Sequence, residues 1–315
     1  LFYGWHIISD LLYLIVLRRF ISKRLDIHVT WKIHDIRNIK TIWKYALGLF
    51  AISIIALVTK QFDKALISKF LTLSELGAYN LATTLGGLSI IFASALSVAS
   101  LTEFTQMVST KRTDDLNITF SRYNTLVATV IITMGVFIAT FATDIIRVWT
   151  NNEHYINIIR DAAPLVVMAL VMIGLQEIPY SLALAYGNTK INNVVGIASL
   201  PMIIVITYWQ ILKNGVYGAG LAYIITMAIQ TIVYLFWIYK KYTPSLIPKL
   251  MLKGFVFPLT ISISIASVSK ALILTISSSS LITVLLAIVT GAITLFIEII
   301  VFGRDSLLLF RRKKS

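Results

Sequence analysis

The chain has 315 residues, of which 57% are hydrophobic and only 13% are charged, and its mean hydropathy is +0.84. These values exclude an ordinary soluble domain and predict an all-α, polytopic membrane protein. The chain has no cysteine, and its four histidines show no metal-ligand spacing, which argues against a zinc or redox enzyme. We expect a protein that is not an enzyme and holds neither a metal nor a cofactor.

Nine apolar stretches are the candidate transmembrane helices, because about 20 residues at 1.5 Å each cross roughly 30 Å of hydrocarbon. They are Phe2–Leu17, Trp43–Phe62, Tyr79–Leu101, Asn124–Phe141, Pro164–Tyr186, Val194–Leu212, Ala219–Tyr239, Gly254–Leu274 and Leu281–Phe302. The first stretch is short, and the sequence opens with Leu1 rather than Met. We therefore expect a C-terminal fragment of a longer protein.

The positions of the basic residues predict the orientation of the chain. When the nine spans are threaded alternately across the membrane, about three quarters of the 28 Lys and Arg residues fall on one side. This places the basic C-terminal tail in the cytoplasm. The net charge of +14 is then explained by loops that face anionic lipid, and we expect no nucleic-acid partner.

Two amphipathic segments predict helices on the membrane surface, where an apolar stripe with a polar flank is stable. The first lies in residues 18–42 and carries its stripe at Ile33, Ile36, Ile39, Ile42 and Trp43. The second, weaker pattern lies in the loop 144–163, at Tyr155, Ile158, Ile159 and Ala162. A plain loop is the alternative for both, and it has about equal weight for the second.

A charge cluster follows the second apolar stretch. Lys60, Asp63 and Lys64 are spaced i, i+3 and i+4, so a helix that continues past Thr59 presents them on one face, with Lys69 further along. Charge inside hydrocarbon costs several kcal/mol, so such residues usually line a polar route or pair internally. The alternative is a solvated helix end from which the lysines snorkel to water.

A second polar segment lies well inside the stretch Pro164–Tyr186. Here Gln176, Glu177, Pro179 and Tyr180 place an amide, a carboxylate and a helix break together. Glu177 is a candidate for proton coupling or substrate contact, and the alternative is a structural hydrogen bond to a neighbouring helix. Helix kinks are expected at Pro179, Pro201 and Pro258.

Four segments carry a family resemblance by their order and spacing, namely Phe62–Phe70, Glu75–Ala82, Tyr180–Lys190 and Asn214–Ala222. Over about residues 40–240 the chain resembles the polysaccharide flippases. These are the O-antigen and related lipid-linked oligosaccharide exporters, in the superfamily that also holds the multidrug and toxin extruders. One departure is that the segment Trp149–Tyr155 lacks the glycine of this turn in relatives.

The resemblance implies two pseudo-symmetric lobes around a central cavity that opens alternately to each side. Residues 1–17 correspond to the last helix of the first lobe, 18–42 to a cytoplasmic inter-lobe connection, 43–242 to the six-helix second lobe, and 243–315 to two extra helices with a basic tail. A chain that lacks the first lobe is expected to be inactive alone.

The resemblance also implies a function. Such flippases carry an undecaprenyl-diphosphate-linked oligosaccharide from the inner to the outer leaflet of the bacterial inner membrane, for lipopolysaccharide and other surface polysaccharides. Polysaccharide assembly proteins are then possible partners. The family's helix after the connection lines the cavity, and Lys60, Asp63 and Lys64 lie on that helix. Our hypothesis is that both lysines meet the diphosphate or an acidic sugar, with Asp63 tuning them.

Three other functions were weighed. A multidrug or cation extruder is expected to bind its cargo through acidic residues, whereas this cluster is net positive. A membrane polysaccharide polymerase or ligase needs a sizeable external loop, and no predicted outer loop exceeds about twenty residues. A purely structural membrane protein explains neither the charge cluster nor the segment Gln176–Tyr180.

Overall fold

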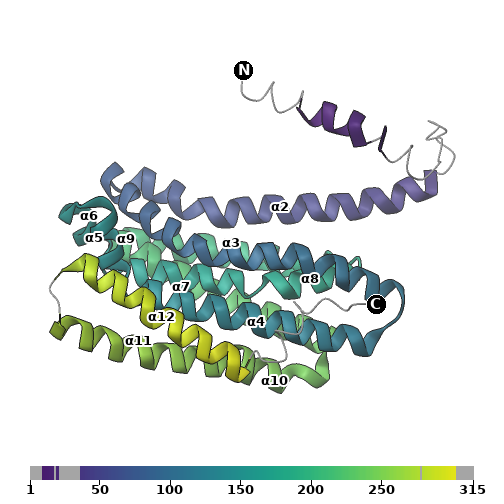
Figure 1. The fold of residues 1–315 in the computed structure, drawn as a ribbon. Coiled ribbons are helices and arrows are strands. Elements are labelled where there is room, and N and C mark those ends of the chain that lie inside the picture. The colour runs from purple at the N-terminus through teal and green to yellow at the C-terminus, as the bar shows by residue number, and fades with distance from the viewer. Residues whose placement is uncertain (1–8, 18, 21–35, 277–278, 303–315) are drawn as a thin grey trace. The chain divides into compact units, whose positions relative to one another are not determined.

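The computed structural model describes residues 9–17, 19–20, 36–276 and 279–302. All regular secondary structure in these residues is helical, in agreement with the predicted fold class (Figure 1). Seven of the described helices or helix pairs are long and apolar enough to cross a membrane. The chain forms two compact units, Leu1–Ala46 and Leu47–Ser315.

The first unit contains a short helix over residues 9–17, whose apolar side chains are exposed. The predicted first span lies only partly within the described residues. Most of the predicted interfacial segment, residues 21–35, lies outside them. Its last residues begin helix α2 (Ile36–Phe70), which runs on into the second unit without a break.

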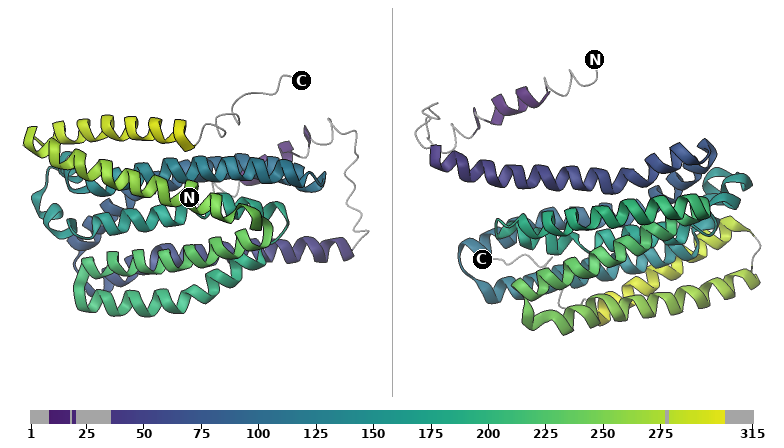
Figure 2. Two further views of the ribbon diagram at one scale, coloured as in Figure 1. Left: turned by 90° about the horizontal axis from the view of Figure 1, so that it is seen from below. Right: turned by 180° about the vertical axis from the view of Figure 1, so that it is seen from behind.

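The second unit is a bundle of long helices joined by short connections (Figures 1 and 2). After α2 come α3 (Leu73–Ser109), α4 (Thr113–Thr140), α5 (Ala142–Thr150), α6 (Glu153–Ile159), α7 (Ala163–Gly174), α8 (Glu177–Ala185), α9 (Lys190–Tyr242), α10 (Ile247–Met251), α11 (Phe257–Ile276) and α12 (Ser280–Phe302). A 3₁₀ turn (Pro244–Leu246) precedes α10, and a π-helical turn (Leu252–Val256) follows it.

Helix α9 is a hairpin whose two arms are the predicted spans Val194–Leu212 and Ala219–Tyr239. The backbone of Gly215 is non-helical, with φ 57° and ψ −135°, a conformation that favours glycine. Tyr242 at the end of α9 returns to the residues that precede it, where the Asn188 amide nitrogen donates to the Tyr242 hydroxyl at 2.8 Å. A straight helix of 53 residues is about 80 Å long, so this contact requires a reversal.

The three prolines that we expected to kink helices differ in their surroundings. The stretch from Ala163 to Ala185 is interrupted between α7 and α8, and Pro179 lies in the first turn of α8. Pro201 lies on an exposed face of α9, and the helix continues through it. Pro258 is the second residue of α11, directly after the π-helical turn.

Helix α4 lies at the centre of the packing, with most of its side chains buried. It packs against α3, α7, α11 and α12. Small residues allow close approach beside it: a Cβ atom added to Gly86 of α3 is only 2.6 Å from Leu170 of α7. The core of the unit therefore lies on the α3, α4 and α7 side.

The loop 144–163 contains helices rather than a plain loop, but they do not lie free on a surface. Ile156, Ile159 and Ala162 are buried against the bundle, so the predicted surface helix is corrected to a helical cap. Asn151 adopts the left-handed conformation that ends α5, with φ 48° and ψ 35°. Asparagine tolerates this conformation, which explains how the turn forms without the expected glycine.

Candidate functional site

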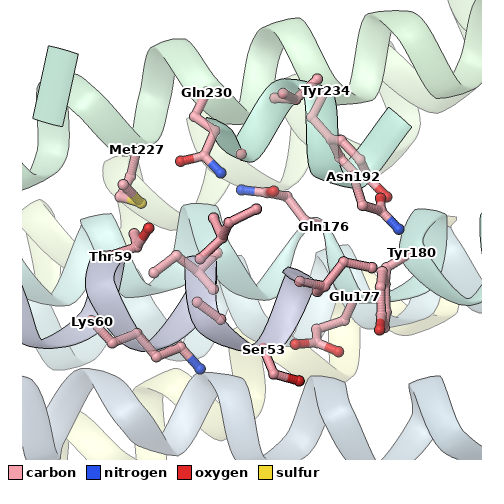
Figure 3. A pocket seen from close by; sticks show the side chains of 16 residues that line it. Ser53, Thr59, Lys60, Gln176, Glu177, Tyr180, Asn192, Met227, Gln230 and Tyr234 are labelled. Atoms are coloured by element: carbon pink, nitrogen blue, oxygen red, sulfur yellow. The ribbon is translucent and has the colours of Figure 1, made fainter. Parts of the chain in front are cut away.

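A pocket of about 300 Å³ lies between α2, the α7–α8 break and both arms of α9 (Figure 3). Its polar lining residues are Ser53, Thr59, Lys60, Gln176, Glu177, Tyr180, Asn192, Gln230 and Tyr234. Its apolar lining comes from Ile52, Ile55, Ala56, Ile173, Val195 and Met227, with Gly196. The pocket thus places charged, amide and hydroxyl groups inside a bundle of membrane helices.

Helix α2 is held at both ends of the pocket. At one end the Asn193 amide nitrogen donates to the Gly48 carbonyl at 3.1 Å, and a Cβ atom at Gly48 overlaps Thr189. At the other end the Tyr79 hydroxyl of α3 donates to an Asp63 carboxylate oxygen at 2.5 Å. The pocket occupies the stretch of α2 between these anchors.

Lys60 lies on the pocket wall, not at a helix end. Helix α2 continues to Phe70, so Lys60 is about 15 Å from its end. Lys69 is one residue from this end, and its ammonium lies 5.3 Å from the centre of the Phe70 ring, which fits the solvated-end alternative. Lys60 is an exposed residue on the pocket wall.

Lys60 and Glu177 lie on the same side of the pocket, where the charge of Lys60 acts on the carboxylate (Figure 3). No ion pair within 4.0 Å involves either side chain in the described part of the chain. The two groups therefore interact without forming a direct salt bridge.

The expected single charged face is corrected by the structure. Asp63 is only 5% exposed and is turned into the bundle, where it also accepts a hydrogen bond from the Lys64 backbone nitrogen at 2.7 Å. Lys64 and Lys69 are not among the residues that line the pocket. Asp63 lies about 60° around the helix axis from Lys60, and Lys64 lies about one turn further along α2, beyond the pocket.

Gln176, Glu177 and Tyr180 come together in the pocket with Lys60, although about 115 residues separate them in sequence. The helix break is stabilised by neighbouring hydroxyls: Ser97 of α3 donates to the Glu177 carbonyl at 3.0 Å. The Gln176 amide nitrogen donates to the Thr231 hydroxyl at 2.8 Å. These bonds hold the polar segment against α3 and α9.

Sequence reasoning missed Thr59, Asn192, Gln230 and Tyr234. Polar atoms of all four are buried and have no hydrogen-bond partner: the Thr59 and Tyr234 hydroxyls, both amide atoms of Asn192 and the Gln230 amide oxygen. Gln230 could have been found as an amide within the apolar stretch Ala219–Tyr239. Thr59 and Tyr234 carry no comparable signal, because threonine and tyrosine are common in membrane helices. Asn192 lies outside the predicted span Val194–Leu212.

Comparison with solved structures shows the fold. The chain is similar to the lipid II flippase MurJ in an inward closed conformation, with a TM-score of 0.65 and 16% identity, covering 91% of this chain and 59% of that one. It is similar to a MOP superfamily transporter from Pyrococcus furiosus, with a TM-score of 0.54 and 12% identity, covering 84% and 65%. It is also similar to a multidrug resistance MATE family transporter in an outward-facing conformation, with a TM-score of 0.53 and 13% identity, covering 84% of this chain and 65% of that one.

This chain therefore spans less than two thirds of the length of each of these structures. No curated protein matches it in sequence. A family model described as MatE matches residues 49–209, which is about half of the chain and includes most of α2, all of α3 to α8 and most of the first arm of α9. The protein is thus a multi-pass membrane protein that belongs to the MatE family, within the exporter superfamily that the sequence resemblance indicated.

Proposed function

We propose that the protein is a transporter, not an enzyme, that carries a polyprenyl-diphosphate-linked oligosaccharide across the bacterial inner membrane by alternating access. The observation that carries this proposal is the polar pocket with Lys60 on its wall, inside a bundle of apolar helices. The proposed cargo serves the export of surface polysaccharide, and the proposed orientation keeps the C-terminus in the cytoplasm.

The chemistry of such a cargo requires a polar lining. A diphosphate and a chain of sugar hydroxyls lose their hydration in hydrocarbon, whereas a polyprenyl tail is stable there. The pocket offers Lys60 to the charged part and amide and hydroxyl groups to the sugar. Lysine is a point charge on a flexible stem, which suits transient binding during transport.

The members of the charge cluster receive separate roles in this proposal. Lys60 is the member that we propose to contact the head group, because it lines the pocket. We assign Asp63 a different role, because its carboxylate is bound to Tyr79 and anchors α2. Lys64 then serves as an internal comparison, since it is a lysine on the same helix outside the pocket.

An extruder of lipophilic cations is the second candidate function. Glu177 favours it, because a carboxylate in a membrane pocket attracts a cationic compound. Lys60 opposes it, since its ammonium acts on that same carboxylate. Both functions fit the fold, and they differ in the charge of the cargo.

Complementation of a flippase-deficient bacterium tests the proposal. The full-length protein is expected to restore export and to prevent lipid-linked oligosaccharide from accumulating in the inner leaflet. Lys60→Gln is expected to lower export at least tenfold, because a hydrogen bond to a charged group contributes about 1.5–3 kcal/mol. Lys64→Gln, the matched control, is expected to leave export within about twofold.

Two results contradict the proposal. One is unchanged export in Lys60→Gln when both variants are present at equal levels in the membrane. The other is a cell that gains resistance to cationic drugs but never restores export of any lipid-linked oligosaccharide, which favours the extruder.

A further inference from the structure

One wall of the pocket is uncharged and unsatisfied. We define the neutral wall as Asn192, Gln230 and Tyr234 of α9 with Thr59 of α2. Figure 3 shows the amides of Asn192 and Gln230 together with Tyr234 on one side of the pocket, and Lys60 and Glu177 on the other. Thr59 and Tyr234 are only 9% and 3% exposed.

The polar atoms of the neutral wall lack partners within the protein. Buried polar groups in folded proteins are nearly always hydrogen-bonded, so each exception calls for an explanation. Here the unpaired atoms of four side chains gather in one pocket: two hydroxyls, both atoms of the Asn192 amide and the Gln230 amide oxygen. Such a concentration indicates a surface that donates hydrogen bonds to a ligand and accepts them from it.

The kind of atom defines the kind of ligand. Amide and hydroxyl groups both donate and accept, so together they match a partner that also does both. Sugar hydroxyl and acetamido groups have this property, whereas a phosphate at neutral pH chiefly accepts. The apolar side chains of Ile173, Val195 and Met227, which also line the pocket, are suited to the C–H faces of a sugar ring.

The neutral wall itself supports an uncharged ligand. Both charged side chains of the pocket, Lys60 and Glu177, lie on the opposite side, so an acidic sugar on the neutral wall meets no cation there. We infer that the neutral wall binds an uncharged sugar residue of the head group through its hydroxyl and amide groups, while Lys60 meets the diphosphate. This inference rests on the proposed function and adds the part of the cargo that determines specificity.

Binding of two probes to the purified full-length protein tests the inference. One probe is a short-chain polyprenyl diphosphate that carries N-acetylglucosamine, and the other is the same polyprenyl diphosphate without the sugar. The protein is expected to bind the sugar-bearing probe at least tenfold more tightly, which corresponds to about 1.4 kcal/mol. This comparison needs no variant, so it does not depend on whether any variant folds.

Variants then assign the preference to the neutral wall. The double variant Gln230→Met, Tyr234→Phe is expected to bring the affinity ratio of the two probes close to one. Lys60→Gln is expected to weaken the binding of both probes and to preserve the ratio of their affinities. Thr226→Val is the matched control, because the Thr226 hydroxyl is buried on the same arm of α9 but bonds to the Ala222 carbonyl at 2.8 Å.

The possible failures are distinguishable. Equal binding of the two probes by the unmodified protein overturns the inference and leaves the proposed function standing. A folded double variant that retains the full sugar preference also overturns it. If neither probe binds while a lipophilic cation does, the proposed function fails, and the inference fails with it.

Discussion

Helices α4 and α2 are both apolar enough to cross a membrane, yet they differ in how far the bundle buries them. Most of the central part of α4 is buried between its neighbours, whereas the most apolar stretch of α2 contains no buried residue. Helix α4 also has a cavity beside it, of about 370 Å³, but the lining of that cavity is almost entirely apolar, whereas the pocket beside α2, between the anchors at Gly48 and Asp63, is lined by charged, amide and hydroxyl groups. Hydropathy alone therefore does not distinguish a scaffold helix from a helix that lines a pocket.

The packed side of the unit contributes stability, whereas the pocket side carries the groups that we propose for ligand recognition. Close packing of α3, α4 and α7 provides the rigid part of the unit, because close-packed interiors have low compressibility. The α2 side contains polar atoms without protein partners, which lowers stability where a ligand can bind. Substitutions should thus affect folding most on the packed side and transport most on the pocket side.

The largest effect on stability is expected at Gly86. A Cβ atom there is 2.6 Å from Leu170 and 3.0 Å from the Val167 backbone, so Gly86→Leu must push α3 and α7 apart. Overpacking of this kind costs up to about 3 kcal/mol, which thermal unfolding in detergent measures. Gly87→Leu is the control, because a Cβ atom at Gly87 meets nothing within 4 Å. Equal melting temperatures for the two variants contradict the picture of a close-packed side.

A smaller effect is expected at the anchor of α2. Tyr79→Phe removes the hydroxyl that donates to the buried Asp63 carboxylate, at a cost of about 2 kcal/mol for a hydrogen bond to a charged group. Tyr208→Phe is the control, since Tyr208 is exposed beside Phe70. The unfolding temperature measures both, and an unchanged value in Tyr79→Phe means that Asp63 does not anchor α2.

In the pocket, a substitution that removes an unpaired polar group is expected to preserve or raise stability rather than lower it. Gln230→Met replaces a buried amide whose oxygen has no partner, so we expect this variant to be as stable as the unmodified protein or more stable by about 1 kcal/mol. The same thermal assay measures it. A clear loss of stability contradicts the assignment of Gln230 to recognition.

The smallest effect is expected at the helical cap formed by α5 and α6. The Arg147 guanidinium hydrogen-bonds the Glu153 carboxylate at 2.8 Å and lowers its pKa. A lowered pKa in the folded state adds stability above the ordinary pKa of about 4.3, and this contribution is lost as the pH falls through the lowered value. Glu153→Gln should therefore reduce the loss of thermal stability below pH 4. An identical acid profile in both proteins contradicts a contribution from this pair.

The positions of most helices could be predicted from the sequence, because long apolar stretches have few alternatives in a membrane. The reversal at Gly215 and the interruption before Glu177 coincide with a glycine and a nearby proline. The orientation of Asp63 could not be predicted, since the i, i+3 spacing does not reveal that the Tyr79 hydroxyl of another helix donates a hydrogen bond to it. The neutral wall could not be predicted either, because Thr59 and the residues of α9 come together only through packing between distant segments.

The hairpin in α9 places Asn192 and Gln230 on two arms of one continuous segment, joined at Gly215. Their relative positions therefore depend on the length of the turn between the arms. Because each residue advances a helix by about 100°, inserting one residue on the arm between Gly215 and Gln230 rotates one amide away from the other without changing any side chain. A change in the length of this arm thus rearranges the pocket lining without substituting any of the residues that form it.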